Sequence, residues 1–452
     1  MTGAAQAESG SRKPLRLLFI SNGHGEDAIG ARLAASILRF WSGGSPLGEL
    51  KMTAFPLVGL GGAYLKAGVP VVGPCRELPS AGLTLHHPSL LWRDLRAGVV
   101  GLTLAQASFL RGFAADAVLV VGDAFAQALA ALVRAPRSVY QPLVSVRQTE
   151  GRIRTPLNRL FMERIRAPEL LLMRRAARVY ARDEATAAWL RQAGVDDAVH
   201  LGNPMMDGLE AQPLPMPAGA RAVALLPGSR PYAHRSIKTM LAALELAAQA
   251  RGQRETRSGT QSGAQPEAPR LVGLAAWALG EPPPAPRGWT VQANQGRSLA
   301  GGGELAAVWR KGAAEVWWLK EAFATVLASA EAAFGTAGTA NEQAAGLGLP
   351  VTAFAVPPDY GHAFLDGQRR LLGGALRVVG QAVGFGYGSG DSATEPGLLA
   401  ELAEAVTQAL TDGSHLAAAR TSGPERMGGP GGTNKIAADI AVWLAELSAA
   451  RR

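Results

Sequence analysis

The sequence contains very little cysteine. Cys75 is the one cysteine among its 452 residues, which excludes an intrachain disulfide framework and any metal site built only from cysteines. Proteins without disulfides are typical of reducing compartments. We therefore expect a cytoplasmic protein. A second expectation is peripheral contact with the inner face of the cytoplasmic membrane.

Long apolar runs are also missing. No segment reaches the roughly 18 uninterrupted apolar residues of a membrane-spanning helix, and the nearest candidate, residues 97–110, contains Gln106. The polar stretch 1–14 is followed by an apolar run, Leu15–Ser21, that is too short for the core of a signal peptide. The sequence therefore predicts neither a membrane span nor a targeting signal.

Aromatic residues are scarce, whereas positive charge is in excess. Aromatics make up 6% of the chain and the formal net charge is +9, which favours contact with phosphates or an anionic lipid surface. The basic residues are not interleaved with stacking aromatics, so we expect no nucleic-acid partner. One basic stretch suits an anionic membrane surface or a phospholipid-like acceptor, or equally a solvated helical face. It contains Arg147, Arg152, Arg154, Arg159, Arg164, Arg166, Arg174, Arg175 and Arg178.

Short apolar runs alternate with helical stretches along the whole chain, which predicts parallel sheets with crossover helices. A chain of 452 residues exceeds the usual size of one core, so we predict two Rossmann-like, doubly wound α/β domains facing a cleft. The predicted parts are a disordered tail at 1–14, a first domain at 15–208, a second domain at 219–400 with a flexible insertion at 251–269, and C-terminal helices at 401–452. We expect the last of these helices to cross back to the first domain.

A first polar constellation follows the strand Leu15–Ser21, before a helix predicted to begin near Asp27. The carboxyl ends of parallel strands are the usual ligand site of such sheets. Two adjacent carboxylates disfavour a nucleotide phosphate here, so we predict acceptor or catalytic contacts, with a purely structural turn as the alternative. The predicted contacts are catalytic for His24 and Glu26, and belong to an acceptor loop for Asn22, Gly23 and Gly25.

Asp123 directly follows the apolar run Ala117–Val121 and Gly122. A carboxylate in this place can act as a general base on an acceptor hydroxyl. It can equally cap the following helix by accepting backbone N–H bonds. The sequence leaves both interpretations open.

Two small-residue loops in the second domain predict a nucleotide diphosphate site. Each follows a predicted strand and opens a helix, whose first N–H groups favour an anion, and an arginine fork can bind two phosphate oxygens at once. A carboxylate one turn inside the second helix can accept hydrogen bonds from vicinal ribose hydroxyls. The structural alternatives are a tight turn with a solvated arginine and a carboxylate that merely favours a helix N-terminus. The predicted residues are Gly228, Ser229, Arg230, Gly335, Thr336, Gly338, Thr339 and Glu342.

A weaker site follows at Asp359, His362 and Gln368. These side chains could bind hydroxyls of a transferred sugar. Polar loop residues are also commonly just solvated.

Four segments of the chain resemble lipid-A-disaccharide synthase and its relatives. They are Leu225–Arg230, Gly335–Glu342 with Pro350, Leu201–Asp207 after Arg182–Glu184, and Val120–Asp123. The resemblance covers nearly the whole chain and is greatest in the second half. The spacing from Glu342 to Pro350 is also similar to the ribose-binding segment of UDP-GlcNAc 2-epimerases, another GT-B group.

The resemblance implies the GT-B fold and a metal-independent, inverting hexosyltransferase that needs no cofactor. It would move a hexose or N-acetylhexosamine from a UDP-sugar, bound by the second domain, to a lipid-like acceptor on the first. By resemblance Asp123 would be the base, Arg230 would bind the diphosphate and Glu342 the ribose. The loop Ser21–Asp27 departs from the synthase pattern, which points to an acceptor other than the lipid A precursor. The alternatives are a UDP-sugar epimerase and a catalytically silent UDP-binding relative.

Overall fold

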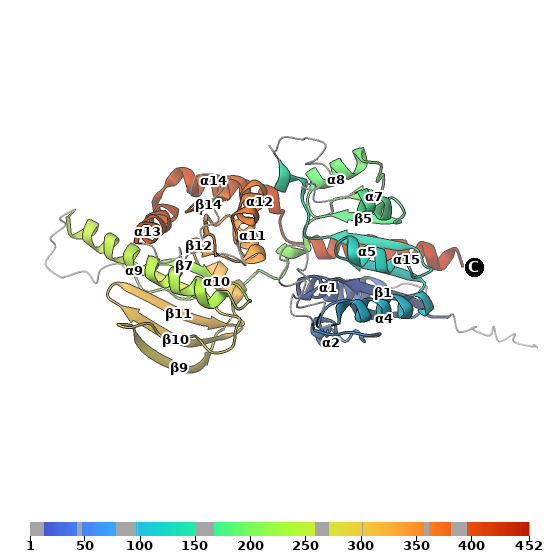
Figure 1. The fold of residues 1–452 in the computed structure, drawn as a ribbon, viewed down its shortest axis with the longest axis horizontal. Coiled ribbons are helices and arrows are strands. Elements are labelled where there is room, and N and C mark those ends of the chain that lie inside the picture. Colours follow the sequence, from blue (N-terminus) through green and yellow to red (C-terminus); the bar gives the residue numbers. More distant parts are fainter. Residues whose placement is uncertain are drawn as a thin grey trace, which may run out of the picture. The chain divides into compact units, whose positions relative to one another are not determined.

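A computed structural model describes residues 13–42, 48–77, 96, 98–150, 167–257, 271–300, 302–356, 361–380 and 396–451. The chain forms two compact units, each built on one sheet (Figure 1). The first unit comprises Met1–Val146, Arg152–Met205 and Gly431–Arg452, and the second comprises Arg147–Gly151 and Met206–Pro430. Two α/β units with parallel sheets confirm the predicted fold class.

The first unit contains a six-stranded sheet in the order β2-β1-β3-β4-β5-β6. All of its pairings are parallel, so the carboxyl ends of its strands share one edge. The strands are β1 (Leu15–Ser21), β2 (Leu50–Pro56), β3 (Ala117–Val121), β4 (Arg137–Gln141), β5 (Arg178–Ala181) and β6 (Ala198–Val199).

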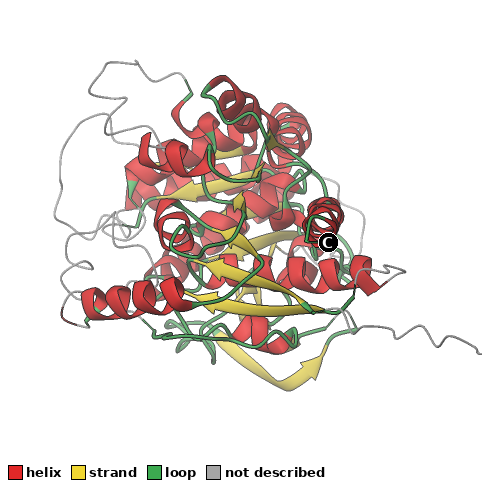
Figure 2. Cartoon of the chain, turned by 90° about the vertical axis from the view of Figure 1, so that its right-hand side faces the viewer, coloured by secondary structure: helices red, strands yellow, loops and turns green. Residues whose placement is uncertain are grey.

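Helices cover both faces of this sheet; Figure 2 draws the helices in red and the strands in yellow. Side chains alternate along a strand, so Phe19 joins the core beneath α1, α2 and α15, whereas Ile20 joins the core beneath α4, α5, α7 and α8. The central strand β3, with the sequence AVLVV, is accordingly apolar throughout and fully buried, as a strand covered on both faces should be. The helices are α1 (His24–Ser42), α2 (Gly62–Lys66), α4 (Val99–Gly112), α5 (Ala124–Ala130), α7 (Ala167–Met173), α8 (Glu184–Gln192) and α15 (Gly432–Ala449).

The last helix, α15, packs against α1 within the first unit. The hydroxyl of Tyr180 on β5 donates to Asp439 at 2.6 Å, and Ser36 on α1 donates to Asn434 at 2.7 Å. A Cβ on Gly432 would lie 2.6 Å from the backbone nitrogen of Asn203, so only glycine allows the helix to begin there. The C-terminal segment thus completes the first core.

The second unit contains an eight-stranded sheet in the order β14-β13-β12-β7-β8-β11-β10-β9. Strands from β14 to β11 are parallel, whereas β11, β10 and β9 pair antiparallel. The antiparallel β9 and β10 were not predicted, because β9 is largely polar. The strands are β7 (Arg221–Leu226), β8 (Leu271–Ala276), β9 (Thr290–Ser298), β10 (Glu304–Lys311), β11 (Ala314–Lys320), β12 (Ala332–Gly335), β13 (Val351–Phe354) and β14 (Leu376–Val379).

Two predictions about the second unit are corrected. The predicted flexible insertion at 251–269 begins too early, because α9 continues to Arg257 through residues with good helix propensity; residues 258–269 lie outside the described part. The predicted boundary at 400 falls inside α13, and α14 also belongs to this unit, since a Cβ on Gly423 would lie 1.9 Å from the carbonyl oxygen of Ala345 on α11. The helices are α9 (Ala233–Arg257), α10 (Phe323–Ser329), α11 (Gly338–Gly346), α12 (His362–Leu372), α13 (Pro396–Thr411) and α14 (Gly413–Met427).

Short 3-10 helices lie at η2 (Val146–Thr149), η3 (Pro204–Met206) and η4 (Gly373–Ala375). Among the residues that the structure describes, none of the helices combines the length and the apolar character needed to cross a bilayer.

Candidate functional site

The two predicted diphosphate loops leave the second sheet side by side. Strand β7 ends at Leu226 and β12 ends at Gly335, and these two residues are partners in a parallel ladder. The loop with Arg230 and the helix start that precedes Glu342 therefore share one sheet edge. Sequence reasoning placed these segments together, and the strand order brings them together.

Thr336 joins the two loops. Its backbone nitrogen donates to Leu226 O at 3.0 Å, and its hydroxyl lies 2.8 Å from Ser236 Oγ and 3.2 Å from Pro227 O. The hydroxyl of Tyr232 donates to the carbonyl oxygen of Thr336 at 3.3 Å. Thr336 is fully buried, so its side chain holds the loops in register and does not present a hydroxyl to a ligand.

Asn341, which was not predicted, fixes the start of α11 from inside. Its amide nitrogen donates to Gly335 O at 3.2 Å and to Gln368 Oε1 at 3.3 Å, and Gln368 donates to Gly338 O at 2.8 Å. A Cβ on Gly335 would lie 2.0 Å from Asn341 Oδ1, so this amide requires glycine there. Gln368 is 3% exposed; it therefore ties α12 to α11, and its predicted contact with a transferred sugar is replaced by this internal role.

Arg230 supplies an exposed guanidinium at this edge. Gly228 has a φ of +95°, and a Cβ there would also crowd the Tyr232 hydroxyl at 3.1 Å, so the turn needs glycine. Ser229 and Arg230, which follow, are both exposed. The backbone carbonyl of Arg230 accepts from Ala233 N at 2.8 Å as α9 begins, which leaves the guanidinium on the solvent side of a fixed turn.

The N-terminus of α11 lies at the same edge. Ala337 is the N-cap and offers no side-chain hydrogen bond, and Gly338 and the exposed Thr339 form the first turn. The first N–H groups of a helix have no partner within the helix, and together with the helix dipole they favour an anion. The edge therefore carries backbone donors from α11 and the guanidinium of Arg230, and both kinds of group can bind an anion.

The remaining predicted donor-side residues are placed as follows. Glu342 lies in the second turn of α11 and is 8% exposed. His362 is exposed at the first position of α12, and Phe364, 42% exposed, lies 3.0 Å from where a Cβ on Gly338 would be. Asp359 lies outside the described residues.

In the first unit, neighbouring strands bring the other two polar segments together. Ser21 at the end of β1 pairs with Val121 at the end of β3. The residues that follow are adjacent, since a Cβ on Gly122 would lie 3.1 Å from the Cβ of Asn22. The predicted acceptor loop and Asp123 therefore share the carboxyl edge of the first sheet.

Helix α1 begins at His24, earlier than predicted, because Asp27 N donates to Gly23 O at 2.8 Å and closes the first turn. Gly25 and Glu26 are thus helical, and the acceptor loop shortens to Asn22 and Gly23. His24 is exposed and its ring contacts Gly59 after β2, where a Cβ would lie 2.8 Å from His24 Cε1. Glu26 is buried, at 8% exposure.

Asp27 is a buried carboxylate at this edge. Ser21 Oγ donates to its Oδ1 at 2.6 Å, and the Tyr64 hydroxyl donates to Ser21 Oγ at 3.1 Å. Asp27 is 1% exposed, and its Oδ2 has no hydrogen-bond partner in the described structure. Burial raises the pKa of Asp27 from 3.8 to about 6, although the bond from Ser21 and the charge of His24 oppose the rise.

This buried carboxylate predicts a specific dependence of stability on pH. A pKa raised on folding contributes stability that is fully present below pH 3.8 and lost as the pH rises through about 6. The difference between the folded-state and unfolded-state pKa of Asp27 corresponds to about 3 kcal/mol of unfolding free energy. We therefore expect Asp27→Asn to gain stability relative to the wild type between pH 4 and pH 7, measured as free energy of unfolding in urea. A constant difference across that interval would contradict the raised pKa.

Asp123 caps helix α5. Its Oδ1 accepts from Phe125 N at 3.0 Å, so the capping interpretation is observed. The side chain is half-buried at the same edge as His24. Capping occupies one lone pair of one oxygen, so the carboxylate retains lone pairs that can accept hydrogen bonds from a ligand.

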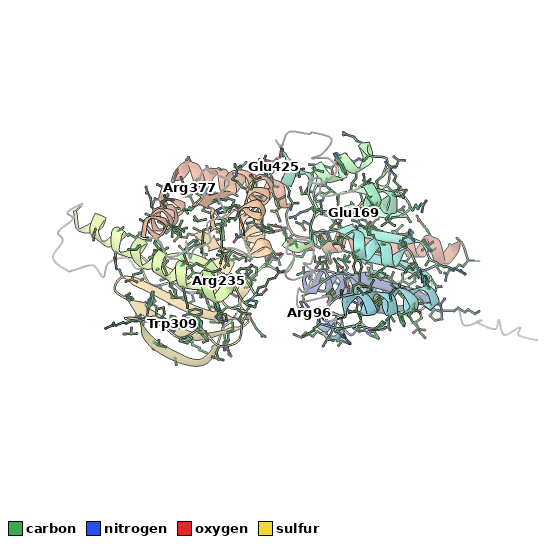
Figure 3. The ribbon with its side chains drawn as sticks, in the orientation of Figure 1. Arg96, Glu169, Arg235, Trp309, Arg377 and Glu425 are labelled. Atoms are coloured by element: carbon green, nitrogen blue, oxygen red, sulfur yellow. The ribbon has the colours of Figure 1, made fainter. Side chains whose placement is uncertain are left out.

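A buried network beside Asp123 was missed in the sequence. Glu169 on α7, labelled in Figure 3, accepts from Gln127 Nε2 at 3.1 Å and from Gln141 Nε2 at 2.6 Å. These three side chains are at most 3% exposed. Gln127 also donates to Gly122 O at 3.4 Å, so the network supports the backbone next to Asp123. Its members lie far apart in sequence, and no local pattern marks them.

The predicted basic stretch is described only in part, because residues 151–166 lie outside the described ranges. Arg174 donates to Ala193 O at 3.1 and 2.5 Å. Arg178 forms ion pairs with Asp439 at 3.6 Å and Glu446 at 3.7 Å on α15. These two arginines therefore serve packing within the first unit.

No protein-family model and no curated protein matches the sequence. Solved structures do match its fold. A candidate UDP-N-acetylglucosamine 2-epimerase from Listeria monocytogenes is 12% identical, with 97% of this chain and 98% of that chain covered and a TM-score of 0.52. The glycotransferase of kitacinnamycin is 16% identical, with 96% and 100% covered and a TM-score of 0.52.

A third similar structure is the complex of S. aureus MnaA with UDP. It is 13% identical, with 95% of this chain and 97% of that chain covered and a TM-score of 0.51. Identities this low establish the fold alone. The chain accordingly has the two-domain α/β architecture with parallel sheets that GT-B glycosyltransferases and UDP-GlcNAc 2-epimerases share.

Proposed function

We propose that this protein is a GT-B glycosyltransferase that moves a hexose or N-acetylhexosamine from a UDP-sugar to a hydroxyl group of a lipid-like acceptor. One observation carries the proposal: the turn with Arg230 and the start of α11 leave paired strands at one sheet edge, and Thr336 joins them. A cation and free helix N–H groups in one place suit a diphosphate. The buried carboxylate of Glu342 on the same helix suits a ribose.

The donor roles follow from these positions. Arg230 and the first N–H groups of α11 would neutralise the charge that develops on the departing diphosphate, with no metal ion assigned to that task. Glu342 would accept hydrogen bonds from the ribose hydroxyls. The exposed His362 would contact the sugar. These assignments are proposals built on the geometry of the second unit.

The acceptor roles belong to the first unit. In the proposed step, the O–H bond of the acceptor breaks, its proton passes to a protein base, and the oxygen forms a bond to the anomeric carbon. The bond from that carbon to UDP breaks, and UDP leaves with the electron pair. Asp123 and His24 share the sheet edge where such a base is needed. We assign the base to His24, because its ring is exposed while Asp123 already caps α5.

The lipid-like nature of the acceptor is proposed from the sequence motifs and from the net charge of +9. Phosphate-bearing lipids would be attracted to such a protein at a membrane surface. A soluble protein that visits the membrane from the cytoplasmic side would meet both a nucleotide sugar and a lipid acceptor.

Two measurements test the proposal. Calorimetry should show that the wild-type protein binds UDP, and binding of no uridine nucleotide would contradict the donor site. Incubation of radiolabelled UDP-GlcNAc or UDP-glucose with a total lipid extract should then move label into the organic phase. UDP binding without any label transfer would leave a silent UDP-binding relative as the better description.

A UDP-GlcNAc 2-epimerase is the second candidate. The spacing from Glu342 to Pro350 favours it, because that segment resembles the epimerases, and a candidate epimerase is among the structures with the same fold. Incubation of UDP-GlcNAc without an acceptor separates the two functions. An epimerised nucleotide sugar would support the epimerase, whereas unchanged UDP-GlcNAc that becomes lipid-linked only with extract would support the transferase.

A further inference from the structure

Neither the helix dipole nor core packing explains why Asp27 is buried with one carboxylate oxygen unpartnered. An acidic residue in the first turn favours a helix while exposed to water, but Asp27 is 1% exposed and its Oδ2 has no hydrogen-bond partner. A buried carboxylate destabilises the folded chain unless its charge is compensated. Desolvated titratable groups that have a specific charge partner are common at functional sites.

The carboxylate is held in place from two sides. Its Oδ1 accepts from Ser21, the last residue of β1, and Ser21 accepts from Tyr64 on α2. The Tyr64 hydroxyl fits only because residue 30 is glycine, where a Cβ would lie 2.0 Å from it. Both hydrogen bonds point toward Asp27, so the chain Tyr64–Ser21–Asp27 orients a negative charge.

His24 is the exposed side chain that interacts with the charge of Asp27. His24 and Asp27 are three residues apart on α1, and side chains at that spacing lie on the same face of a helix. His24 is exposed and is kept in place by contact with Gly59. The other titratable groups that act on this cluster are Glu26 on the same helix, Tyr64 on α2, and Cys75, whose thiol interacts with Asp27.

We propose that Asp27 is a positioning residue for His24, and that its oriented, buried carboxylate stabilises the imidazolium that His24 forms when it accepts a proton from a ligand hydroxyl. The hydroxyl O–H bond breaks, an N–H bond forms on the imidazole, and the electron pair remains on the ligand oxygen for its attack on the sugar. The positive charge then lies next to a fixed negative charge. The inference rests on the proposed function only in naming the ligand as the acceptor.

This assignment differs from one in which Asp123 is the partner of His24. Asp123 caps α5 through Phe125 N, and it is half-buried, so water shields its charge. Asp27 is shielded from water and oriented by a two-step hydrogen-bond chain. A charge is most effective where it is desolvated and preorganised, which favours Asp27.

A double-mutant cycle in stability tests the pair without any substrate. Wild type, His24→Gln, Asp27→Asn and the double variant are melted between pH 4 and pH 9. Near pH 6, where the Asp27 carboxyl ionises, the melting temperature of the double variant should lie about 2 °C above the value obtained by adding the two single-variant changes to the wild-type value. The excess should vanish at pH 4, where the Asp27 carboxyl is protonated and neutral. Additive effects at every pH would overturn the proposal, and so would an excess that does not change with pH, because packing alone gives that result.

Matched variants keep the test decisive. Glu184→Gln, an exposed first-turn carboxylate on α8, should show no coupling to His24 at any pH. If Asp27→Asn folds poorly, Ser21→Ala replaces it: the charge stays, its donor is lost, and the pH of maximal coupling should move upward. An unmoved maximum would show that Ser21 does not act on Asp27.

An activity arm links the pair to transfer. With radiolabelled UDP-GlcNAc and lipid extract, Asp27→Asn should lower kcat severalfold while UDP affinity stays unchanged, and the double variant should be no slower than His24→Gln alone. A double variant much slower than His24→Gln would contradict action through His24. Coupling in stability without any label transfer would keep the pair and reject the proposed acceptor chemistry, so the two failures are distinguishable.

Discussion

Arg230→Ala is expected to weaken UDP binding by about 10-fold to 100-fold. A guanidinium can grip two phosphate oxygens in one plane, and hydrogen bonds to charged groups contribute about 1.5–3 kcal/mol. Arg230 is exposed on a turn that Gly228 and Tyr232 fix, so the backbone needs no reordering and the ordering cost falls on the side chain alone. Calorimetric titration with UDP measures the loss, and uridine should show a far smaller one because it has no phosphates.

Two further variants control this result. Arg230→Lys keeps the charge but loses the fork, so its affinity should fall between those of wild type and Arg230→Ala. Arg369→Ala removes an exposed arginine from the last turn of α12, and its UDP affinity should equal that of the wild type. Equal losses for Arg369→Ala and Arg230→Ala would show a diffuse effect of net charge and would remove the specific diphosphate contact.

The shared sheet edge of the two predicted loops could be expected from the sequence, because the signal of each loop is local. The pattern of a strand, small residues and a helix can be recognised in Leu225–Arg230 and again in Gly335–Glu342. The alternation of strands and helices predicts a parallel sheet, in which such loops share one edge. Confirmation of the fold class follows from the same alternation, since buried parallel strands have few ways to pair. What the pattern could not show is which side chains turn inward.

Thr336 and Gln368 illustrate that limit. Both are polar residues near a predicted ligand loop, and both are buried because they satisfy backbone groups of that loop. Their partners come from about 100 residues away and from a neighbouring helix, respectively, so no local spacing distinguishes a ligand contact from an internal tie. The chain Tyr64–Ser21–Asp27 is hidden for the same reason, since α2 supplies the tyrosine only after β1 and β2 pair.

His24→Gln is expected to lower label transfer to lipid by about 10²-fold to 10⁴-fold, the usual contribution of a general base. Glutamine fills similar space against Gly59 but cannot accept a proton at neutral pH, so the fold and the donor site should be unaffected. UDP affinity by calorimetry should therefore match the wild type while turnover falls. The pH dependence of the residual rate should also flatten on its acidic side, because the group that must be neutral to accept a proton is gone.

Asp123→Asn is the informative comparison for that variant. Asparagine retains an oxygen that can accept from Phe125 N and is as good an N-cap as aspartate, so stability should change little, whereas the charge is removed. We expect its transfer rate to fall by less than that of His24→Gln. If Asp123→Asn abolished transfer and His24→Gln retained most of it, the base would be Asp123, and the role of Asp27 would be confined to the stability of helix α1.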